Sequence, residues 1–222
     1  MPAYDPTGLH LALTDWNQDD TTSLFIIDEG KPARAILNWK EVMLSPHWSP
    51  DGRKIVFGMG RFVRFTGAEK SNDPKHGDDQ VGVVNADGSE FDVITSGPNS
   101  NVFPSFSPDG KLIVYRTNGP DGEGLRIMNI EDRSVTVLTN DYDNFPVWSP
   151  RGDLIEFTRK VGQYFEVFHD PAGWQECDPV DLYSRERHSR VLVAGRTTHR
   201  VYELKDGVQG RSPLYWGGAA LR

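Results

Sequence analysis

The sequence predicts an all-β fold built from one repeated unit, and three observations support this prediction. First, a four-residue motif with Ser or Asp at its first position, Pro at its second and Gly at its fourth recurs about every 42 residues. Second, an apolar run rich in β-branched and aromatic residues follows each copy, as expected for a strand. Third, two further apolar runs follow in each of the first three units. The copies begin at Asp5, Ser49, Ser107 and Ser149.

Each copy of the motif has the composition of a type I turn. This turn favours Ser or Asp at its first position, Pro at its second and Gly at its fourth. Proline presets the backbone angle φ, and the Ser or Asp side chain can bond to the backbone of the turn. We therefore expect a hairpin in each unit, with a short strand before the turn and a stronger strand after it. The clearest copies are Ser49–Gly52, Ser107–Gly110 and Ser149–Gly152, and Asp5–Gly8 is a degenerate copy.

The unit as a whole predicts four antiparallel strands. In the first unit, apolar runs at 9–13, 23–28 and 33–37 follow one another. Four strands at this period are typical of a β-propeller blade. The second unit is longer because residues 59–80 carry an insertion between its second and third strands. In the later units we expect strands near 53–58, 81–85, 91–95, 111–116, 125–129, 135–139, 146–148 and 153–158, and negligible helix before residue 168.

One aromatic position recurs immediately before the turn serine. It is occupied by Trp48, Phe106 and Trp148. An aromatic side chain at the same place in successive units favours packing between neighbouring blades over a stacking platform for nucleic acid bases. We therefore expect these three rings in the core.

The second unit shows the whole pattern most clearly, in Trp48–Phe57, Asn85–Gly88 and Ile94-Thr95. It resembles the WD40-like PD40 repeat, which builds the six-bladed β-propeller of TolB-like proteins. Related blades form the propeller domains of prolyl-oligopeptidase-type peptidases. The resemblance covers residues 1 to about 168 and implies a partial or incomplete propeller of four-stranded antiparallel blades, three complete and a fourth begun. It does not imply one function, because the same scaffold hosts many activities.

Residues 169–222 do not continue the repeat. The formal charge moves from −9 in residues 1–168 (16 basic and 25 acidic) to +1 in residues 169–222 (8 basic and 7 acidic). Two interpretations compete: a genuine C-terminal extension, or a frame-shifted or mis-spliced end, which the abrupt stop in mid-blade favours. We expect no blade here, although residues 190–194 could pair as a lone strand on an open edge.

Composition excludes several classes of partner. The net charge of −8 argues against a nucleic acid backbone, whose binding relies on clustered Lys and Arg. No apolar run approaches the length of a membrane span. The first residues lack the basic and apolar regions of a secretory signal, so we expect a cytoplasmic protein. The single cysteine, Cys177, excludes an internal disulfide.

No motif indicates catalysis or a cofactor. The sequence holds no Gly-x-Ser-x-Gly elbow, no His-Glu-x-x-His and no paired cysteines. His76 with Asp78 and Asp79 could hold a cation, and Asp121 with Glu123 could bind calcium weakly. For the first group a solvated polar loop is the favoured interpretation, and for the second a hairpin connection between the second and third strands. We therefore expect no catalytic residue, no metal and no cofactor.

The geometry of a four-stranded blade indicates where a binding surface would lie. The connection between the second and third strands and the connection leading into the next blade's first strand lie at the same end, and binding residues concentrate on such loops. The insertion contributes Arg61, Arg64 and His76 to this end. The connections that lead into the first strands, near 43–47, 101–105 and 143–147, contribute Asn101, Asp143 and Asn144.

The sequence therefore predicts a non-catalytic scaffold that binds a protein or a peptide. The alternative is the propeller portion of a peptidase or of a carbohydrate-active hydrolase or lyase. Neither prediction includes a nucleic acid partner or insertion into a membrane. An unclosed ring would expose strand edges, which would invite self-association.

Overall fold

The structure is a computed structural model of the 222-residue chain. It describes residues 2–17, 21–60, 79–161, 164–171, 190–193 and 200–203. Every regular element among these residues is a strand, which confirms the all-β prediction. Across the same residues, none forms a helix of the length and apolarity that crossing a bilayer requires.

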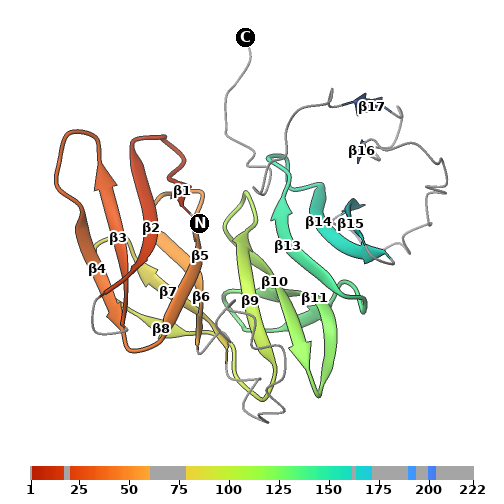
Figure 1. The fold of residues 1–222 in the computed structure, drawn as a ribbon, viewed down its shortest axis with the longest axis horizontal. Coiled ribbons are helices and arrows are strands. Elements are labelled where there is room, and N and C mark those ends of the chain that lie inside the picture. Colours follow the sequence, from red (N-terminus) through yellow and green to blue (C-terminus); the bar gives the residue numbers. More distant parts are fainter. Residues whose placement is uncertain are drawn as a thin grey trace.

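The first two sheets are complete four-stranded antiparallel blades whose strand order follows the chain. Both lie in the left half of Figure 1. Blade 1 consists of β1 (Ala3–Tyr4), β2 (His10–Trp16), β3 (Thr22–Asp28) and β4 (Arg34–Trp39). Blade 2 consists of β5 (Val42–Trp48), β6 (Lys54–Gly60), β7 (Gln80–Asn85) and β8 (Asp92–Val93).

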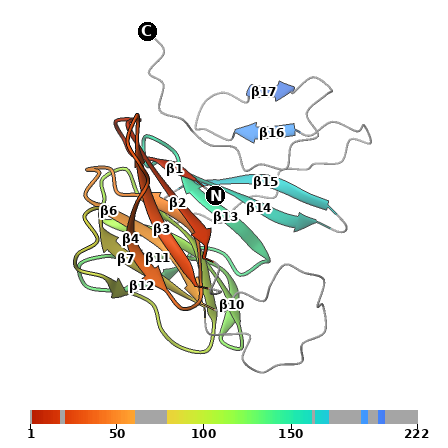
Figure 2. The same cartoon turned by 60° about the vertical axis from the view of Figure 1, so that its left-hand side comes forward.

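The third sheet is a complete blade, and the fourth has three strands. Figure 1 shows the sheets following one another across the molecule, and Figure 2 shows a separate two-stranded sheet beside β15. Blade 3 consists of β9 (Ser100–Phe106), β10 (Leu112–Gly119), β11 (Gly122–Asn129) and β12 (Val135–Val137). Blade 4 consists of β13 (Asp143–Trp148), β14 (Leu154–Val161) and β15 (Tyr164–Pro171), and the separate sheet of β16 (Arg190–Val193) and β17 (Arg200–Glu203).

The predicted strands are found, each within a few residues of its expected bounds. The expected run at 190–194 pairs with β17 rather than standing alone on a blade edge. The division of the chain at residue 168 stays a prediction, and so does the likeness in blade number to the six-bladed TolB-like propeller.

The segments near 43–47, 101–105 and 143–147 correct the sequence analysis. They were expected to be connections, but they belong to the first strands β5, β9 and β13. Each strand contains a proline that has no N–H for the ladder, and each bulges at that point, so the pairing with the next strand resumes after one extra residue. The residue before each proline has a positive φ of 53–55°, and these residues are Ser45, Phe103 and Phe145.

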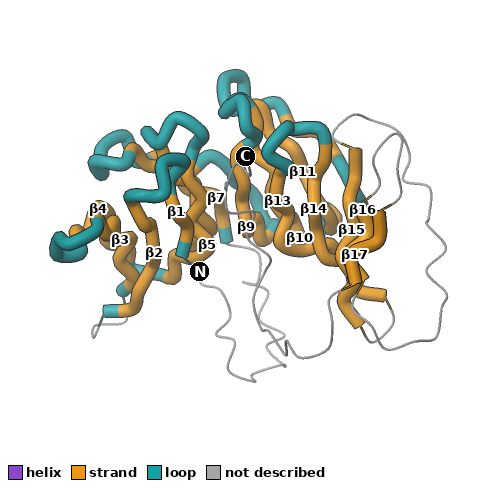
Figure 3. The backbone as a smooth tube through the Cα atoms, turned by 90° about the horizontal axis from the view of Figure 1, so that it is seen from above, coloured by secondary structure: helices purple, strands orange, loops and turns teal. Residues whose placement is uncertain are grey.

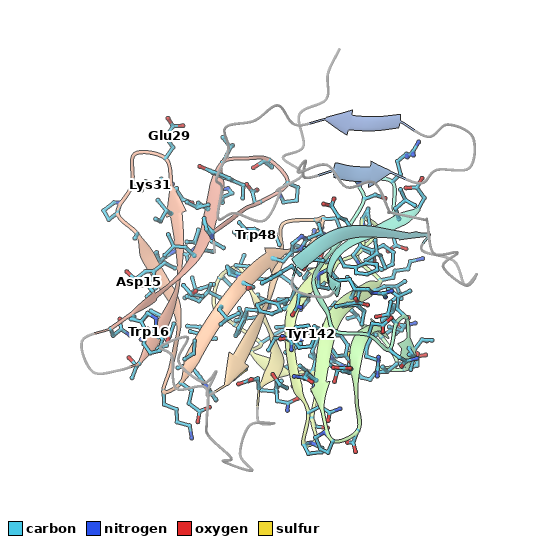
Figure 4. All side chains as sticks on the ribbon, turned by 45° about the vertical axis from the view of Figure 1, so that its right-hand side comes forward. Asp15, Trp16, Glu29, Lys31, Trp48 and Tyr142 are labelled. Carbon is cyan, nitrogen blue, oxygen red and sulfur yellow. The ribbon has the colours of Figure 1, made fainter. Side chains whose placement is uncertain are left out.

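The hydrophobic core lies between the blades rather than within them. A separate cluster of buried side chains fills each of the three junctions. Trp48, Phe106 and Trp148 are 4–7% exposed, and each lies at the junction with the preceding blade, which confirms their predicted packing. Figure 4 labels Trp48 in this position. Burying one such large apolar side chain contributes about 1.5–3 kcal/mol.

The repeated turns form as predicted, with one hydrogen-bond pattern. In blade 2, the Gly52 N–H donates to the Ser49 carbonyl (2.9 Å), and the Ser49 hydroxyl donates to Asp51 Oδ1 (2.6 Å). The same hydroxyl oxygen accepts the Lys54 N–H at 2.9 Å, which ties the turn to the strand that follows. Blade 3 repeats these bonds at Ser107, Asp109, Gly110 and Leu112.

Candidate binding surface

The first strands of neighbouring blades lie side by side and form the inner wall of the arc. β5 contacts β9, and β9 contacts β13. Figure 3 shows these strands in sequence from above. We call the ends where β9 and β13 begin the leading ends. In blade 2 the equivalent edge holds the start of β5, the end of β6 and the start of β7.

At the leading end of blade 3, a polar network joins the base of the insertion to β9. The Ser100 hydroxyl donates to Asp79 Oδ2 at 2.6 Å, and the Asn101 N–H donates to the Asp79 carbonyl at 2.8 Å. Gln80 Oε1 accepts hydrogen bonds from the Asn101 amide (3.0 Å) and from the Thr95 hydroxyl (2.7 Å). The start of β7 therefore lies beside the start of β9, whereas the insertion itself, residues 61–78, lies outside the described residues.

At the leading end of blade 4, the equivalent network is ionic. Asp143 is fully buried, and both of its carboxylate oxygens accept hydrogen bonds from Arg159 on β14, at 2.7 and 2.8 Å. Arg159 also pairs with Asp141 at 3.1 Å, and its guanidinium lies 5.4 Å from the centre of the Phe157 ring. This two-point geometry is the strong form of a charge-assisted pair, and it holds β13 against β14.

These contacts correct the prediction that Asn101, Asp143 and Asn144 lie on exposed rim loops. Their exposed fractions are 5%, 0% and 4%, and all three lie in strands. These polar side chains can be buried because they form hydrogen bonds with side chains of neighbouring strands. The periodicity of a single sequence does not reveal such partners. The other predicted site residues, Arg61, Arg64 and His76, lie outside the described residues.

Near the leading ends, the inner wall carries a group of apolar side chains. Val102 and Phe103 of β9 pack with Val42 and Leu44 of β5. The Phe103 ring lies 4.4 Å from the Phe145 ring of β13, so the apolar surface continues across three blades. We call these five residues the inner apolar strip. Phe103 is 9% exposed, but Phe145 is 38% exposed, so the strip ends in an accessible aromatic ring.

A second accessible ring lies over Arg116 of β10, the residue opposite Val102 of the strip. Tyr142 is 39% exposed, and the Arg116 guanidinium lies 4.7 Å from the centre of its ring. Figure 4 labels Tyr142 among the side chains of the later blades. The sequence analysis missed these aromatic residues because it considered only the polar residues of the segment near 143–147. The signal was present in the recurrence of an X-Pro dipeptide at one repeat position.

One serine and one histidine approach each other, but not as a nucleophile and its base. Ser105 Oγ lies 3.4 Å from His47 Nε2, and the Phe106 N–H donates to His47 Nδ1 at 3.3 Å. Because Nδ1 accepts a hydrogen bond, the proton of the neutral ring lies on Nε2, which therefore donates to the serine. The ring cannot then accept the serine proton. Burial lowers the pKa of His47 from 6.5 to about 4, which keeps the ring neutral.

No cluster of three metal-ligating side chains occurs among residues 2–17, 21–60 and 79–159. Asp121 is the second of the two residues that connect β10 to β11, and its N–H donates to Asn99 Oδ1 at 3.1 Å. This connection is a hairpin, as the sequence analysis expected.

The fold defines a class: a β-propeller arc of four-stranded antiparallel blades, whose first strands form its inner wall. Residues 1–169 match the family described as the TolB beta propeller domain, PD40. The chain belongs to this family.

Similar proteins fall into two groups. The Tol-Pal system protein TolB of Francisella tularensis is 26% identical over 208 residues, which cover 76% of this chain and 44% of that protein. The uncharacterized peptidase YuxL of Bacillus subtilis is 26% identical over 140 residues, which cover 53% of this chain and 21% of that protein. The crystal structure of TolB from Acinetobacter baumannii superposes with a TM-score of 0.61 at 22% identity, covering 75% of this chain and 40% of that one. The chain thus spans less than half the length of these three proteins.

Proposed function

We propose that this chain is a non-catalytic scaffold that binds a peptide segment of a protein partner along the inner wall of the arc. The observation that carries the proposal is the inner apolar strip, which runs across three blades and ends at the exposed Phe145 ring. Partly exposed aromatic rings next to fixed polar groups are typical anchors in protein interfaces.

The chemistry of the strip indicates what the peptide must supply. Its rings and aliphatic side chains fit an apolar or aromatic side chain, which would pack against Phe145. The buried networks at the leading ends hold their strands in place, so the surface is preorganised and little ordering entropy is lost on binding. The name of one relative, Tol-Pal system protein TolB, places that protein in an assembly with other proteins, which supports a protein partner here.

The test uses a displayed heptapeptide library selected on the full chain. We expect the selected peptides to share an apolar or aromatic residue. In a synthetic peptide assay by fluorescence anisotropy, Phe145→Ser should weaken binding at least about 10-fold, the loss typical of an interface anchor. The matched control is Val135→Ser, on the exposed outer strand β12. Equal losses for the two variants, or selected peptides without an apolar residue, would refute the proposal.

The alternative is the propeller portion of a peptidase, and the similarity to the uncharacterized peptidase YuxL favours it. In that case the inner wall would guide substrate peptides toward a catalytic domain. Peptides that bind this chain would then be cleaved by a protein that contains both this propeller and a catalytic peptidase domain. Binding without cleavage by such a protein favours the scaffold.

A further inference from the structure

A cavity of about 240 Å³ lies in the junction between blades 2 and 3, which are neighbours in Figure 1. It lies at the end of the blades that carries the repeated turns, since its lining residue Lys54 follows the turn of blade 2 by two residues. Its floor is apolar and consists of Val83, Ile94, Phe106, Ile113 and Ile130. Its other lining residues are charged, and they are Lys54, Glu90, Asp92 and Arg133. The cavity shares no residue with the inner apolar strip, so this inference is independent of the proposed peptide site.

One lining residue accounts for the space at this junction. Phe106 stands where the junctions on either side have an indole, Trp48 before it and Trp148 after it. The Trp48 indole N–H donates to the Ala3 carbonyl of the preceding blade at 3.0 Å, so an indole at this position reaches across its junction. The phenyl ring of Phe106 is smaller and has no N–H. The junction between blades 2 and 3 therefore keeps room for an aromatic group that Phe106 does not supply.

The volume limits what the cavity can hold. A cavity of about 150 Å³ holds benzene, whereas drug-sized ligands occupy pockets of roughly 300–1,000 Å³. At about 240 Å³, the cavity between blades 2 and 3 lies between these two sizes. It therefore fits one aromatic ring system that carries a short polar group.

The charged residues at the mouth of the cavity indicate which polar group the ligand carries. They form two ion pairs, Lys54 Nζ with Glu90 Oε2 at 3.6 Å and Arg133 Nη2 with Asp92 Oδ2 at 2.9 Å. The four side chains are 41–74% exposed, so each pair contributes little stability and its charges stay available to a ligand. Because the mouth holds two charges of each sign, a ligand with a single charge meets a like charge beside its partner. A zwitterion has an opposite charge for both.

We propose that the cavity binds an aromatic α-amino acid, with tryptophan as the best match. The side chain packs on the apolar floor, the carboxylate faces Lys54 and Arg133, and the ammonium group faces Glu90 and Asp92. Tryptophan fits best because its indole is the group that occupies the equivalent position in the two neighbouring junctions.

The first test is isothermal titration calorimetry of the full chain with L-tryptophan. Three analogues separate the ring from its charges: indole has no charge, tryptamine is a cation and indole-3-acetate is an anion. We expect L-tryptophan to bind at one site per chain, and each analogue to bind at least about 10-fold more weakly because it lacks one or both charged groups. No binding of L-tryptophan, or indole that binds as tightly as L-tryptophan, would overturn the proposal.

A filling substitution tests where the amino acid binds. Phe106→Trp supplies the indole from the chain itself, so we expect it to abolish the binding of L-tryptophan and to raise the thermal midpoint. The matched control is Val137→Trp, which adds the same side chain on the exposed outer strand β12 and should leave binding unchanged. If circular dichroism shows that Phe106→Trp does not fold, Ile130→Trp replaces it at a half-buried position of the same cavity. Undiminished binding in the folded filling variant would refute this location.

The charges at the mouth are tested by Asp92→Asn and Arg133→Gln, which each remove one of them. We expect each variant to bind L-tryptophan about 10-fold more weakly and to bind indole as the unchanged chain does. Ligand-detected nuclear magnetic resonance measures the weaker binding of indole. Equal losses for both ligands, or no loss for L-tryptophan, would contradict recognition of a zwitterion.

Discussion

The two ends of the blades are built in different ways. At the turn end, every unit uses the same bonds: a serine or aspartate oxygen accepts the N–H of the residue five positions later, at 2.9–3.1 Å. At the leading end, blade 3 uses an amide and hydroxyl network around Gln80, whereas blade 4 uses the ion pair of Asp143 and Arg159. The turn end is thus the uniform scaffold, and the leading end is where the units diverge.

Blade 4 shows how the turn tolerates a change of sequence. Arg151 stands where blades 2 and 3 have Asp51 and Asp109. The Ser149 hydroxyl donates instead to Asp153 Oδ1 at 2.7 Å, two residues further along. The serine hydroxyl thus keeps a carboxylate acceptor, although that carboxylate comes from a different position of the turn. The turn requires a carboxylate near the serine rather than one at a particular position.

The largest expected effect lies at the leading end of blade 4. Asp143→Ala would leave the Arg159 guanidinium without its buried partner, and we expect a loss of about 3 kcal/mol of unfolding free energy. Asp141→Asn is the matched control, because that side chain is 65% exposed and its pair should contribute less than about 1 kcal/mol. Urea unfolding of the three proteins gives the comparison. Similar losses for both variants would show that the buried pair does not hold this end.

The turn end can be tested with two glycines of nearly the same conformation. Gly110 has φ 73° and Gly8 has φ 74°, so valine strains the backbone equally at both. Only at Gly110 would the new side chain also meet the Pro50 ring. We expect Gly110→Val to cost about 2–3 kcal/mol and Gly8→Val about 1 kcal/mol. Equal melting temperatures would contradict the proposed contact between successive turns.

A pH effect is expected at His47, near the turn end of β5. The pKa of its ring falls from 6.5 to about 4 because the ring is buried. Below pH 6.5, the unfolded chain therefore binds a proton at His47 that the folded chain does not bind. The free energy of unfolding is highest above pH 6.5 and falls as the pH approaches 4. We expect a loss of about 2 kcal/mol over this range, measured by urea unfolding. His47→Gln should lack this part of the pH dependence, and an unchanged profile would refute the assignment.

The smallest expected effect is the loss of one turn hydroxyl. Ser107→Ala removes the donor to Asp109 and the acceptor of the Leu112 N–H, which should cost about 1 kcal/mol. The Ser107 hydrogen bond is also the main reason that the pKa of Asp109 lies below its usual value. The lowered pKa of Asp109 stabilises the folded protein at pH values above the pKa of an unfolded aspartate. This stabilisation is lost as the pH falls through the pKa of Asp109 in the folded protein. Nuclear magnetic resonance titration should therefore show a higher pKa for Asp109 in Ser107→Ala, and no change would contradict the bond.

The repeat and its turns could be predicted from the sequence because their determinants are local. Ser49, Pro50 and Gly52 act within one turn, and the alternation of apolar residues after it defines a strand without reference to any other blade. The aromatic positions at Trp48, Phe106 and Trp148 were also predictable, since recurrence at one repeat position indicates a common environment.

The leading ends could not be predicted in the same way. Asn101 and Asp143 look like exposed loop residues in the sequence, but they are buried because their partners, Gln80 and Arg159, come from other strands. Similarly, the proline after Phe145 suggests the end of a strand in the sequence, although strand β13 continues past it through a bulge.

The sequence by itself therefore determined the strands, the turns and the blade class of this protein. Only the tertiary structure decided which polar residues are buried and which aromatic rings stay accessible. The physical reason is the range of the interactions. Turn and strand preferences act over a few neighbouring residues, whereas burial depends on which blades meet, and side chains from different strands only then find their partners.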